Sequence, residues 1–168
     1  MSAEGNLIKG KVKRFGNDIN TDQIIQGRYL KLLDYDEMAK HTFEVIRPDF
    51  ASSVEEGDIV VGGRNFGSGS SREEAPMVLK VLGIGCIIAE SFSRIFYRNA
   101  FNIGLPALVV PNISEQVTEG NIILVDLQSG KVIIMETGME LHGDRIPERM
   151  LELLKAGGAI PWFKKHRA

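Results

Sequence analysis

The sequence predicts an α/β domain with mixed sheets, and three observations lead to this class. Short apolar runs bounded by glycine and proline alternate with segments of helical period, as in strands that are connected through helices. Two further apolar runs flank Gln128-Ser129-Gly130, which indicates a β-hairpin. The chain has 168 residues, 43% of them apolar and 25% charged, which fits a single domain over residues 1–168.

The first half of the chain is predicted to hold two strands and one short helix. Residues 7–15 alternate apolar with basic or small side chains, as a half-buried strand does. A polar turn follows at 16–22. Residues 34–43 begin with a possible capping residue and acids in the first turn, which favours a short helix that ends before Pro48. Residues 59–63 then form a buried strand that leads into a glycine-rich loop.

The second half is predicted to alternate helices with strands. Helices are expected over 72–82, 92–101 and 147–155, and strands over 86–89, 105–110, 122–127 and 131–136. Glycines follow the first and last of these helices, as they commonly do at helix ends. Ser91 is the expected N-cap of the second helix. The basic residues from Lys164 to Arg167 are interpreted as a solvated tail.

Composition excludes several classes of function. The net charge is −2 with the basic residues scattered, so no nucleic-acid surface is expected. No apolar run reaches the 18 residues that a membrane span needs, and the first residues lack the core of a signal peptide, so a cytoplasmic protein is expected. Cys86 is the only cysteine and lies in an apolar run, which leaves no internal disulfide. The three histidines are far apart, so this chain alone is expected to bind no metal.

The loop at Asn65 to Glu74, NFGSGSSREE, carries the most chemistry. It lacks the lysine of a Walker A loop and the third glycine of a dinucleotide-binding fingerprint. It also lacks a serine with glycines two residues away on both sides, as a hydrolase elbow requires. These tests leave a strand-to-helix turn, with the helix beginning near Ser71 or Arg72.

Such a turn favours an anion. The first backbone N–H groups of a helix have no intrahelical partner, and they attract carboxylates or phosphates. Arg72 adds a planar guanidinium that suits two-point contact with a carboxylate. The loop therefore predicts a carboxylate-binding site with hydroxyl groups beside it. A simpler alternative is that Ser70 or Ser71 only caps the helix, while Glu73 and Glu74 complement its dipole.

Three motifs in order carry a resemblance to a known family. GNDINTDQIIQGRYL, NFGSGSSREEAP and AESFSRIFYRNAFNIGLPALV resemble the small subunits of the two-chain hydro-lyases in the aconitase superfamily, the isopropylmalate dehydratases and homoaconitases. The resemblance covers essentially the whole chain, and the length is similar to the archaeal-type short form. It implies the swivelling β/β/α domain, with mixed sheets and flanking helices. It also implies a large subunit that carries a [4Fe-4S] cluster, in a heterodimer or heterotetramer.

The resemblance further implies roles for individual residues. Ser70, the first serine of the Ser-Ser-Arg motif, matches the catalytic base, and Asp22 matches the acid of the active-site network. Ser71 and Arg72 match substrate-binding positions. A serine acts as a base only where its alkoxide is stabilised, which unpaired N–H groups and a guanidinium can do.

The segment Gln26 to Leu33 is expected to contact the variable end of the substrate, through Lys31, Leu32 and Leu33. In the aconitase pattern Leu33 falls where that family places a substrate-binding arginine, and this argues against citrate. An apolar pocket formed by Leu32 and Leu33 would suit an isopropyl group, which favours 3-isopropylmalate and leucine biosynthesis.

Other readings of this segment and of the chain stay open. Lys31 stands where homoaconitase small subunits carry an arginine, so homocitrate remains an alternative, as do methylated malates. The leucines could instead pack under the loop and never touch substrate. From a different class, a non-catalytic swivel domain that binds a carboxylate or a partner protein is a further alternative.

Overall fold

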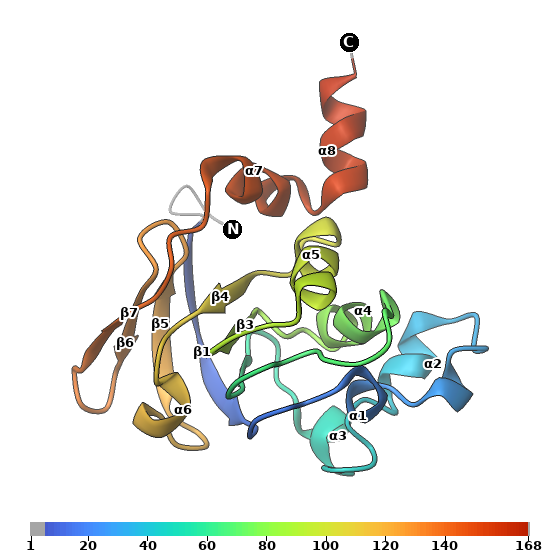
Figure 1. The fold of residues 1–168 in the computed structure, drawn as a ribbon, viewed down its shortest axis with the longest axis horizontal. Coiled ribbons are helices and arrows are strands. Elements are labelled where there is room, and N and C mark those ends of the chain that lie inside the picture. The colour runs from blue at the N-terminus through green and yellow to red at the C-terminus, as the bar shows by residue number, and fades with distance from the viewer. Residues whose placement is uncertain (1–5, 168) are drawn as a thin grey trace.

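A single seven-stranded sheet, in the order β4-β3-β2-β1-β5-β6-β7, organises the computed structural model, which describes residues 6–167 (Figure 1). The strands are β1 (Leu7–Arg14), β2 (Ile59–Val61), β3 (Cys86–Ala89), β4 (Ala107–Val109), β5 (Ile122–Asp126), β6 (Lys131–Ile134) and β7 (Glu140–His142). The predicted α/β class with mixed strand directions is confirmed.

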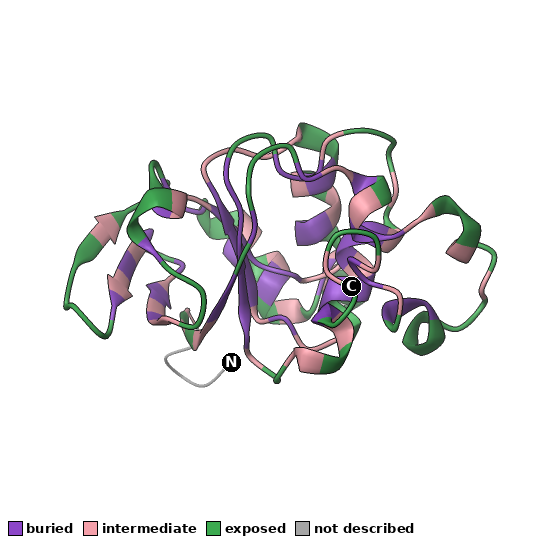
Figure 2. Ribbon diagram, turned by 90° about the horizontal axis from the view of Figure 1, so that it is seen from below, coloured by how far each residue is buried: buried purple, intermediate pink, exposed green. Residues whose placement is uncertain are grey.

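The two halves of the sheet differ in direction and in burial. The last three residues of β1 pair with β2, and β2, β3 and β4 continue the sheet in parallel. Strands β2 and β3 are buried at every position, because helices and loops cover both faces. Residues 7–11 of β1 pair antiparallel with β5, which alternates buried and partly buried residues. Strand β1 therefore joins a covered parallel half to a half-exposed antiparallel half (Figure 2).

The helices lie mostly on the parallel side. They are α1 (Thr21–Ile24), the 3-10 helix η1 (Gly27–Tyr29), α2 (Tyr35–Ala39), α3 (Phe50–Ser53), α4 (Glu74–Val81), α5 (Arg94–Asn102), α6 (Ile113–Gln116), α7 (Glu148–Ala156) and α8 (Ala159–His166). Helices α4 and α5 connect the parallel strands, and α1 to α5 all lie on the same side of β1 (Figure 1). This arrangement brings the turn after β1 next to the loop after β2.

Two expectations about helix ends are corrected. Helix α5 is flanked by Ser93 rather than Ser91, because the Ser91 Oγ instead accepts a hydrogen bond from the Asn65 N–H at 2.7 Å. The C-terminal basic residues form the last turn of α8 rather than an irregular tail, although their side chains are exposed as expected. Lysines and arginines near a helix C-terminus complement its dipole.

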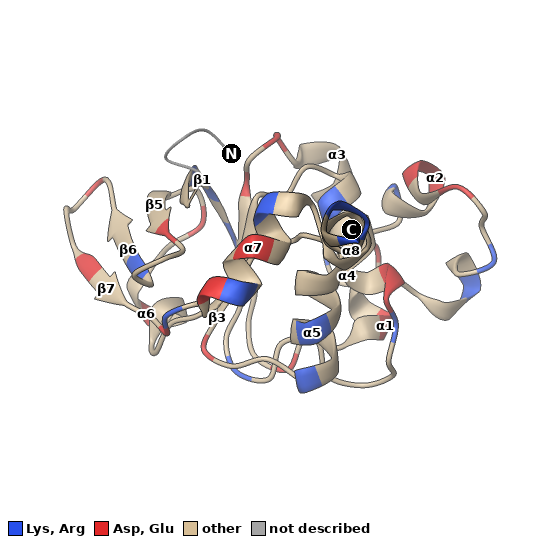
Figure 3. Cartoon of the chain, turned by 90° about the horizontal axis from the view of Figure 1, so that it is seen from above, with Lys and Arg blue, Asp and Glu red and all other residues tan. Residues whose placement is uncertain are grey.

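Acidic and basic residues both occur along the chain, and several basic residues lie on α8 (Figure 3). Within residues 6–167, none of the helices has both the length and the apolar character to span a bilayer.

Candidate active site

The loop between β2 and α4 is held in a defined backbone path. Phe66 forms a parallel bridge with Phe92, and Ser68 forms another with Asn20. Gly67 lies between them with φ at +82°, and a Cβ there would lie 2.2 Å from the ring of Phe96. Only glycine combines this left-handed conformation with such close packing. The glycine therefore lets the loop sit directly on α5.

The start of α1 braces the same loop from the other side. The Thr21 N–H donates to the Ser68 carbonyl at 2.9 Å, and the Thr21 hydroxyl donates to the Ser70 carbonyl at 2.9 Å. Asn20 caps α1 by accepting from the Gln23 N–H at 2.9 Å, while the Gln23 side chain accepts from the Asn20 N–H. This capping box fixes Thr21, so the two motifs that are 50 residues apart in sequence are tied together through backbone groups.

An ion pair completes the junction. The Arg72 Nη1 donates to the Asp22 carboxylate and also to the Ile25 carbonyl, the latter at 3.1 Å. The Arg72 side chain is 16% exposed, whereas that of Asp22 is 64% exposed. Because Nη1 makes both contacts, the remaining donors of the guanidinium are free of protein acceptors within residues 6–167. Asp22 thus orients Arg72 without blocking its other edge.

The expected start of the helix is corrected. Helix α4 begins at Glu74, two to three residues later than predicted, and neither Ser70 nor Ser71 caps it. Pro76 explains the shift, because a proline has no N–H and its ring clashes with the carbonyl four residues earlier in a helix. With the helix beginning at Glu74, Pro76 lies in the first turn, where neither defect matters.

The serines are consequently part of an extended loop. The side chains of Ser70 and Ser71 are exposed. The backbone N–H groups of residues 70, 71 and 72 donate to no acceptor in the part of the chain that the structure describes. The free donors that were expected at a helix terminus are therefore presented by the loop itself, beside Arg72. Hydroxyls, N–H groups and a guanidinium are suitable partners for a carboxylate.

The segment expected to contact the substrate, Gln26 to Leu33, lies beside this loop near its start. At one end, a Cβ on Gly27 would lie 3.5 Å from the Arg72 Nη2. Beyond the other end of the segment, at the first residue of α2, partial burial and the nearby carboxylates of Glu73 and Glu74 raise the pKa of the Tyr35 phenol. Two of the last three residues of the segment are exposed. Lys31 is exposed and Leu33 is 101% exposed, while Leu32 packs against the core.

Leu32 and Leu33 therefore do not form a joint apolar pocket in this chain. One leucine packs under the loop, as the simpler alternative for both residues states, and the other points to solvent. Asp22, Ser70, Ser71 and Arg72 share one junction, and Lys31 and Leu33 lie on the exposed segment beside it.

A cavity of about 420 Å³ opens next to Asp22 and includes residues that the sequence analysis did not single out. Its lining consists of Asn20, Asp22, Gln23, Gln26, Gly27, Arg28 and Val45. The pattern Asn20-x-x-Gln23 is a capping-box signature, so the sequence could have predicted that Asn20 and Gln23 lie at the start of a helix. Arg28 and Val45 carry no such signal, because only the fold brings the turn after α2 next to η1.

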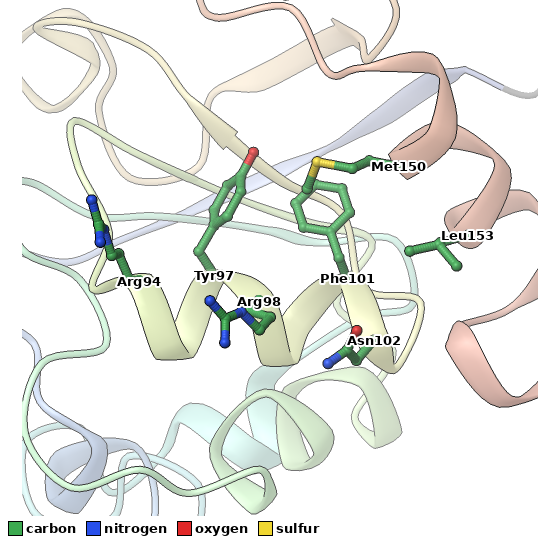
Figure 4. A pocket seen from close by; sticks show the side chains of 7 residues that line it. All are labelled: Arg94, Tyr97, Arg98, Phe101, Asn102, Met150 and Leu153. Carbon is green, nitrogen blue, oxygen red and sulfur yellow. The ribbon is translucent and has the colours of Figure 1, made fainter.

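A second pocket, of about 390 Å³, lies between α5 and α7 (Figure 4). It is lined by Arg94, Tyr97, Arg98, Phe101, Asn102, Met150 and Leu153. None of the residues predicted to form the site lines it. Arg94, the first residue of α5, lines this pocket, whereas Arg72 does not.

Comparison with known proteins agrees with these motifs. Residues 8–113 match the family of the aconitase C-terminal domain. The isopropylmalate/citramalate isomerase small subunit of Methanocaldococcus jannaschii is 50% identical over 162 residues, which are 96% of each chain. The 3-isopropylmalate dehydratase small subunit of Halothermothrix orenii is 49% identical and covers 94% of this chain and 95% of its own length. A methanogen homoaconitase small subunit from Methanothermobacter thermautotrophicus is 47% identical, over 95% and 92%.

A solved structure has the same fold as this chain. The crystal structure of 3-isopropylmalate dehydratase from Methanocaldococcus jannaschii superposes with a TM-score of 0.91 at 39% identity, covering 96% of this chain and 95% of that one. The swivel-domain fold is thus shared with a solved 3-isopropylmalate dehydratase chain. This chain belongs to the aconitase C-terminal domain family.

Proposed function

We propose that this chain is the small subunit of a two-chain hydro-lyase that isomerises a 2-hydroxy dicarboxylic acid. The observation that carries the proposal is the junction of the Ser70-Ser71-Arg72 loop with α1, where Asp22 orients Arg72. Membership of the aconitase C-terminal domain family supports it, and so do relatives that are named as small subunits of such enzymes. The name of a small subunit implies a large-subunit partner.

The reaction requires removal of a proton from a carbon next to a carboxylate. In our proposal the carboxylate binds the free edge of Arg72, the Ser71 hydroxyl and the open loop N–H groups. The Ser70 alkoxide takes the proton from carbon, and the hydroxyl on the neighbouring carbon receives a proton from a general acid, which we assign to the large subunit, and leaves as water. Water then adds across the resulting double bond in the opposite sense, and the proton returns to carbon from Ser70. The atoms balance, because the product is an isomer of the substrate.

Asp22 is proposed to act through Arg72. Its carboxylate contacts the guanidinium and is not hydrogen-bonded to either serine. A fixed guanidinium meets the charge that develops on the substrate carboxylate without reorganising first. This explains why an acid and an arginine 50 residues apart in sequence need the capping box and the Thr21 hydrogen bonds.

An iron–sulfur cluster, which the family generally uses, finds no suitable ligand set here. Iron–sulfur clusters are held by several cysteine thiolates. Cys86 is the single cysteine of the sequence, it is fully buried in β3, and burial raises the pKa of its thiol above the usual range. No group of three His, Cys, Asp or Glu side chains in residues 6–167 is arranged to hold a metal ion. We therefore propose that the cluster belongs to the large subunit.

For the substrate we propose 3-isopropylmalate. A fully exposed Leu33 offers an apolar side chain where an additional carboxylate would need a cation. Several relatives are named for isopropylmalate, one of them also for citramalate and another as a homoaconitase. Lys31, which is exposed on the same segment, keeps homocitrate as the competing substrate.

The test is anaerobic reconstitution with a large subunit that carries the cluster, followed by turnover assays on 3-isopropylmalate, citramalate, homocitrate and citrate. We expect turnover of 3-isopropylmalate with the highest kcat/KM. Higher kcat/KM on homocitrate would overturn the substrate assignment. A reconstituted complex that binds these acids but converts none of them would overturn the hydro-lyase assignment and favour a carboxylate-binding module.

A further inference from the structure

A cluster of side chains at the start of the substrate segment has no role in the chemistry above. The Tyr29 hydroxyl donates to the Glu44 Oε2 at 2.5 Å. The Arg28 Nη2 donates to the Tyr29 oxygen at 2.7 Å, and its guanidinium lies 4.7 Å from the centroid of the tyrosine ring. The other face of the cluster is formed by His41, whose ring stacks on Tyr29 with centroids 3.7 Å apart and planes 9° apart.

Glu44 is the centre of this cluster. Besides the tyrosine hydroxyl, it contacts the His41 Nδ1 at 3.1 Å and the Arg28 Nη2 at 3.5 Å. The hydrogen bond from Tyr29, and then that from His41, lower the pKa of the Glu44 carboxyl. An ionised carboxylate only accepts hydrogen bonds, so the proton of the neutral imidazole must be on Nδ1. Glu44 thus receives donors from both the substrate segment and the turn after α2.

The turn that presents Glu44 is fixed to the core by its neighbour. Phe43 has φ at +57°, although it is not glycine, and it is fully buried. Its ring stacks on Phe15 with centroids 4.1 Å apart, and its N–H donates to the Ile24 carbonyl at 2.9 Å. A bulky residue keeps this conformation only where its surroundings impose it, and such strain is frequent at functional positions.

The cluster therefore connects a rigid support to the part of the chain that contacts the substrate. Tyr29 precedes Lys31 by two residues, and the Leu32 N–H donates to the Tyr29 carbonyl at 3.0 Å. The support, in turn, is bonded to α1 at Ile24, two residues after Asp22. Holding the phenol of Tyr29 therefore holds the backbone from which the exposed residues Lys31 and Leu33 follow.

We propose that Glu44, with His41 and Tyr29, forms a clamp that positions Lys31 to Leu33 and thereby sets substrate discrimination. These are positioning residues, because they act on the substrate through the segment. The inference rests on the proposed function, since it assumes that Lys31 and Leu33 face the variable end of the bound acid. It goes beyond that function by assigning a part in specificity to Glu44 and His41, which lie outside the substrate segment.

A merely stabilising surface cluster makes a different prediction. Loss of stability alone would lower the melting temperature and reduce activity on all acids by one common factor. A positioning clamp affects KM more than kcat, and affects acids with different variable ends unequally. Whether the segment is held in place can also be measured without an enzymatic assay, from the rate of amide hydrogen exchange at residues 30–34.

Each single variant changes one side chain of the cluster. Tyr29→Phe removes the hydroxyl and keeps the ring stack, while His41→Phe keeps the stack and removes the Nδ1 donor. Glu44→Gln removes the charge and keeps the shape. The matched control is Glu37→Gln, which removes an exposed carboxylate on α2 whose one ion-pair partner among residues 6–167 is Lys40, at 2.7 Å. The double variant Tyr29→Phe/Glu44→Gln measures coupling between the two residues.

In the reconstituted complex, we expect Glu44→Gln to raise KM for 3-isopropylmalate about five- to tenfold, with kcat within about twofold. The ratio of kcat/KM for 3-isopropylmalate to kcat/KM for citramalate should fall by a similar factor. In the chain alone, residues 30–34 should exchange about five- to tenfold faster, and the double variant should be no worse than Glu44→Gln. Glu37→Gln should match the wild type in all of these measurements.

Two results would overturn the clamp. One is unchanged exchange of residues 30–34 in Glu44→Gln. The other is an equal loss of kcat on both acids with an unchanged KM. Failure of the proposed function is distinguishable, because a wild-type complex that converts none of the acids contradicts that function, while the exchange data still decide whether the cluster holds the segment.

Discussion

The two segments on either side of the Arg72–Asp22 pair are built in opposite ways. The loop from Asn65 to Glu73 is tied down at successive residues, by bridges at Phe66 and Ser68 and by close packing of Gly67 on Phe96. The segment from Gln26 to Leu33 lies beside this loop near its start, whereas Lys31 and Leu33 near its end are exposed.

This difference separates two tasks. Proton transfer needs groups that are held in place before the substrate arrives, which a braced loop provides. Recognition of a variable side chain needs positions that can change without disturbing that loop, which an exposed segment provides. We infer that the braced loop determines the reaction and the exposed segment determines the substrate.

The largest effect on activity is expected from removing the proposed base in the braced loop. Ser70→Ala should lower kcat by about 10³-fold or more, because it removes the proposed base. The side chain is exposed, and it makes no hydrogen bond to residues 6–167, so the melting temperature should stay within about 1 °C of the wild type. Ser52→Ala, at an exposed serine of α3, is the control for activity and stability. Activity near that of the wild type would remove Ser70 from this role.

A smaller loss of activity should follow from changing Arg72, which is proposed to bind the substrate carboxylate. Arg72→Lys keeps the charge but loses the planar guanidinium that bonds Asp22 and the Ile25 carbonyl while presenting a free edge. We expect kcat/KM to fall about 10- to 100-fold for every acid that is turned over. Steady-state kinetics on two acids would check this. A loss confined to one acid would contradict the proposed common role.

The rigidity of the same loop can be tested by stability alone. Gly67→Ala combines a left-handed backbone with a Cβ placed 2.2 Å from Phe96, so we expect a loss of about 2–4 kcal/mol in the free energy of unfolding. Gly16→Ala is the matched control, because a Cβ there meets no atom within 4 Å. It should change stability by less than about 0.5 kcal/mol. Chemical denaturation of both variants measures the difference.

The exposed segment should respond in the opposite way. Leu33→Ala should leave the free energy of unfolding unchanged, because the side chain is 101% exposed. Leu32→Ala should lower it by about 1 kcal/mol, since Leu32 packs on the core while remaining partly exposed. Equal losses for the two leucines would contradict the arrangement of the segment.

Much of this fold could be predicted from local patterns. The buried strands around Val60 and Ile87 have apolar runs that only a covered parallel sheet accommodates, and Gly157 ends α7 in the left-handed conformation expected of a helix C-cap. The hairpin between β5 and β6 is also confirmed. The predicted helix over 72–82 is present as α4, but its predicted start near Ser71 or Arg72 was wrong, because Pro76 restricts where that helix can begin.

Other features depend on long-range contacts that no local pattern contains. Asp22 and Arg72 were singled out individually, but their ion pair requires the turn after β1 to meet the loop after β2. The role of Glu44 could not be found either, because it follows from its contacts with Tyr29 and His41 and from the strained backbone at Phe43. Leu32 and Leu33 are adjacent in sequence, and only the structure shows that one is packed and the other exposed.

The most direct test compares kcat/KM for 3-isopropylmalate and homocitrate in complexes that carry wild-type, Ser70→Ala or Leu33→Arg small subunits. If the loop determines the reaction, Ser70→Ala lowers both values by the same factor and leaves their ratio unchanged. If the exposed segment determines the substrate, Leu33→Arg shifts the ratio towards homocitrate by about tenfold or more, because it supplies a cation for the additional carboxylate. A ratio that changes in Ser70→Ala, or stays within about twofold in Leu33→Arg, would contradict this division.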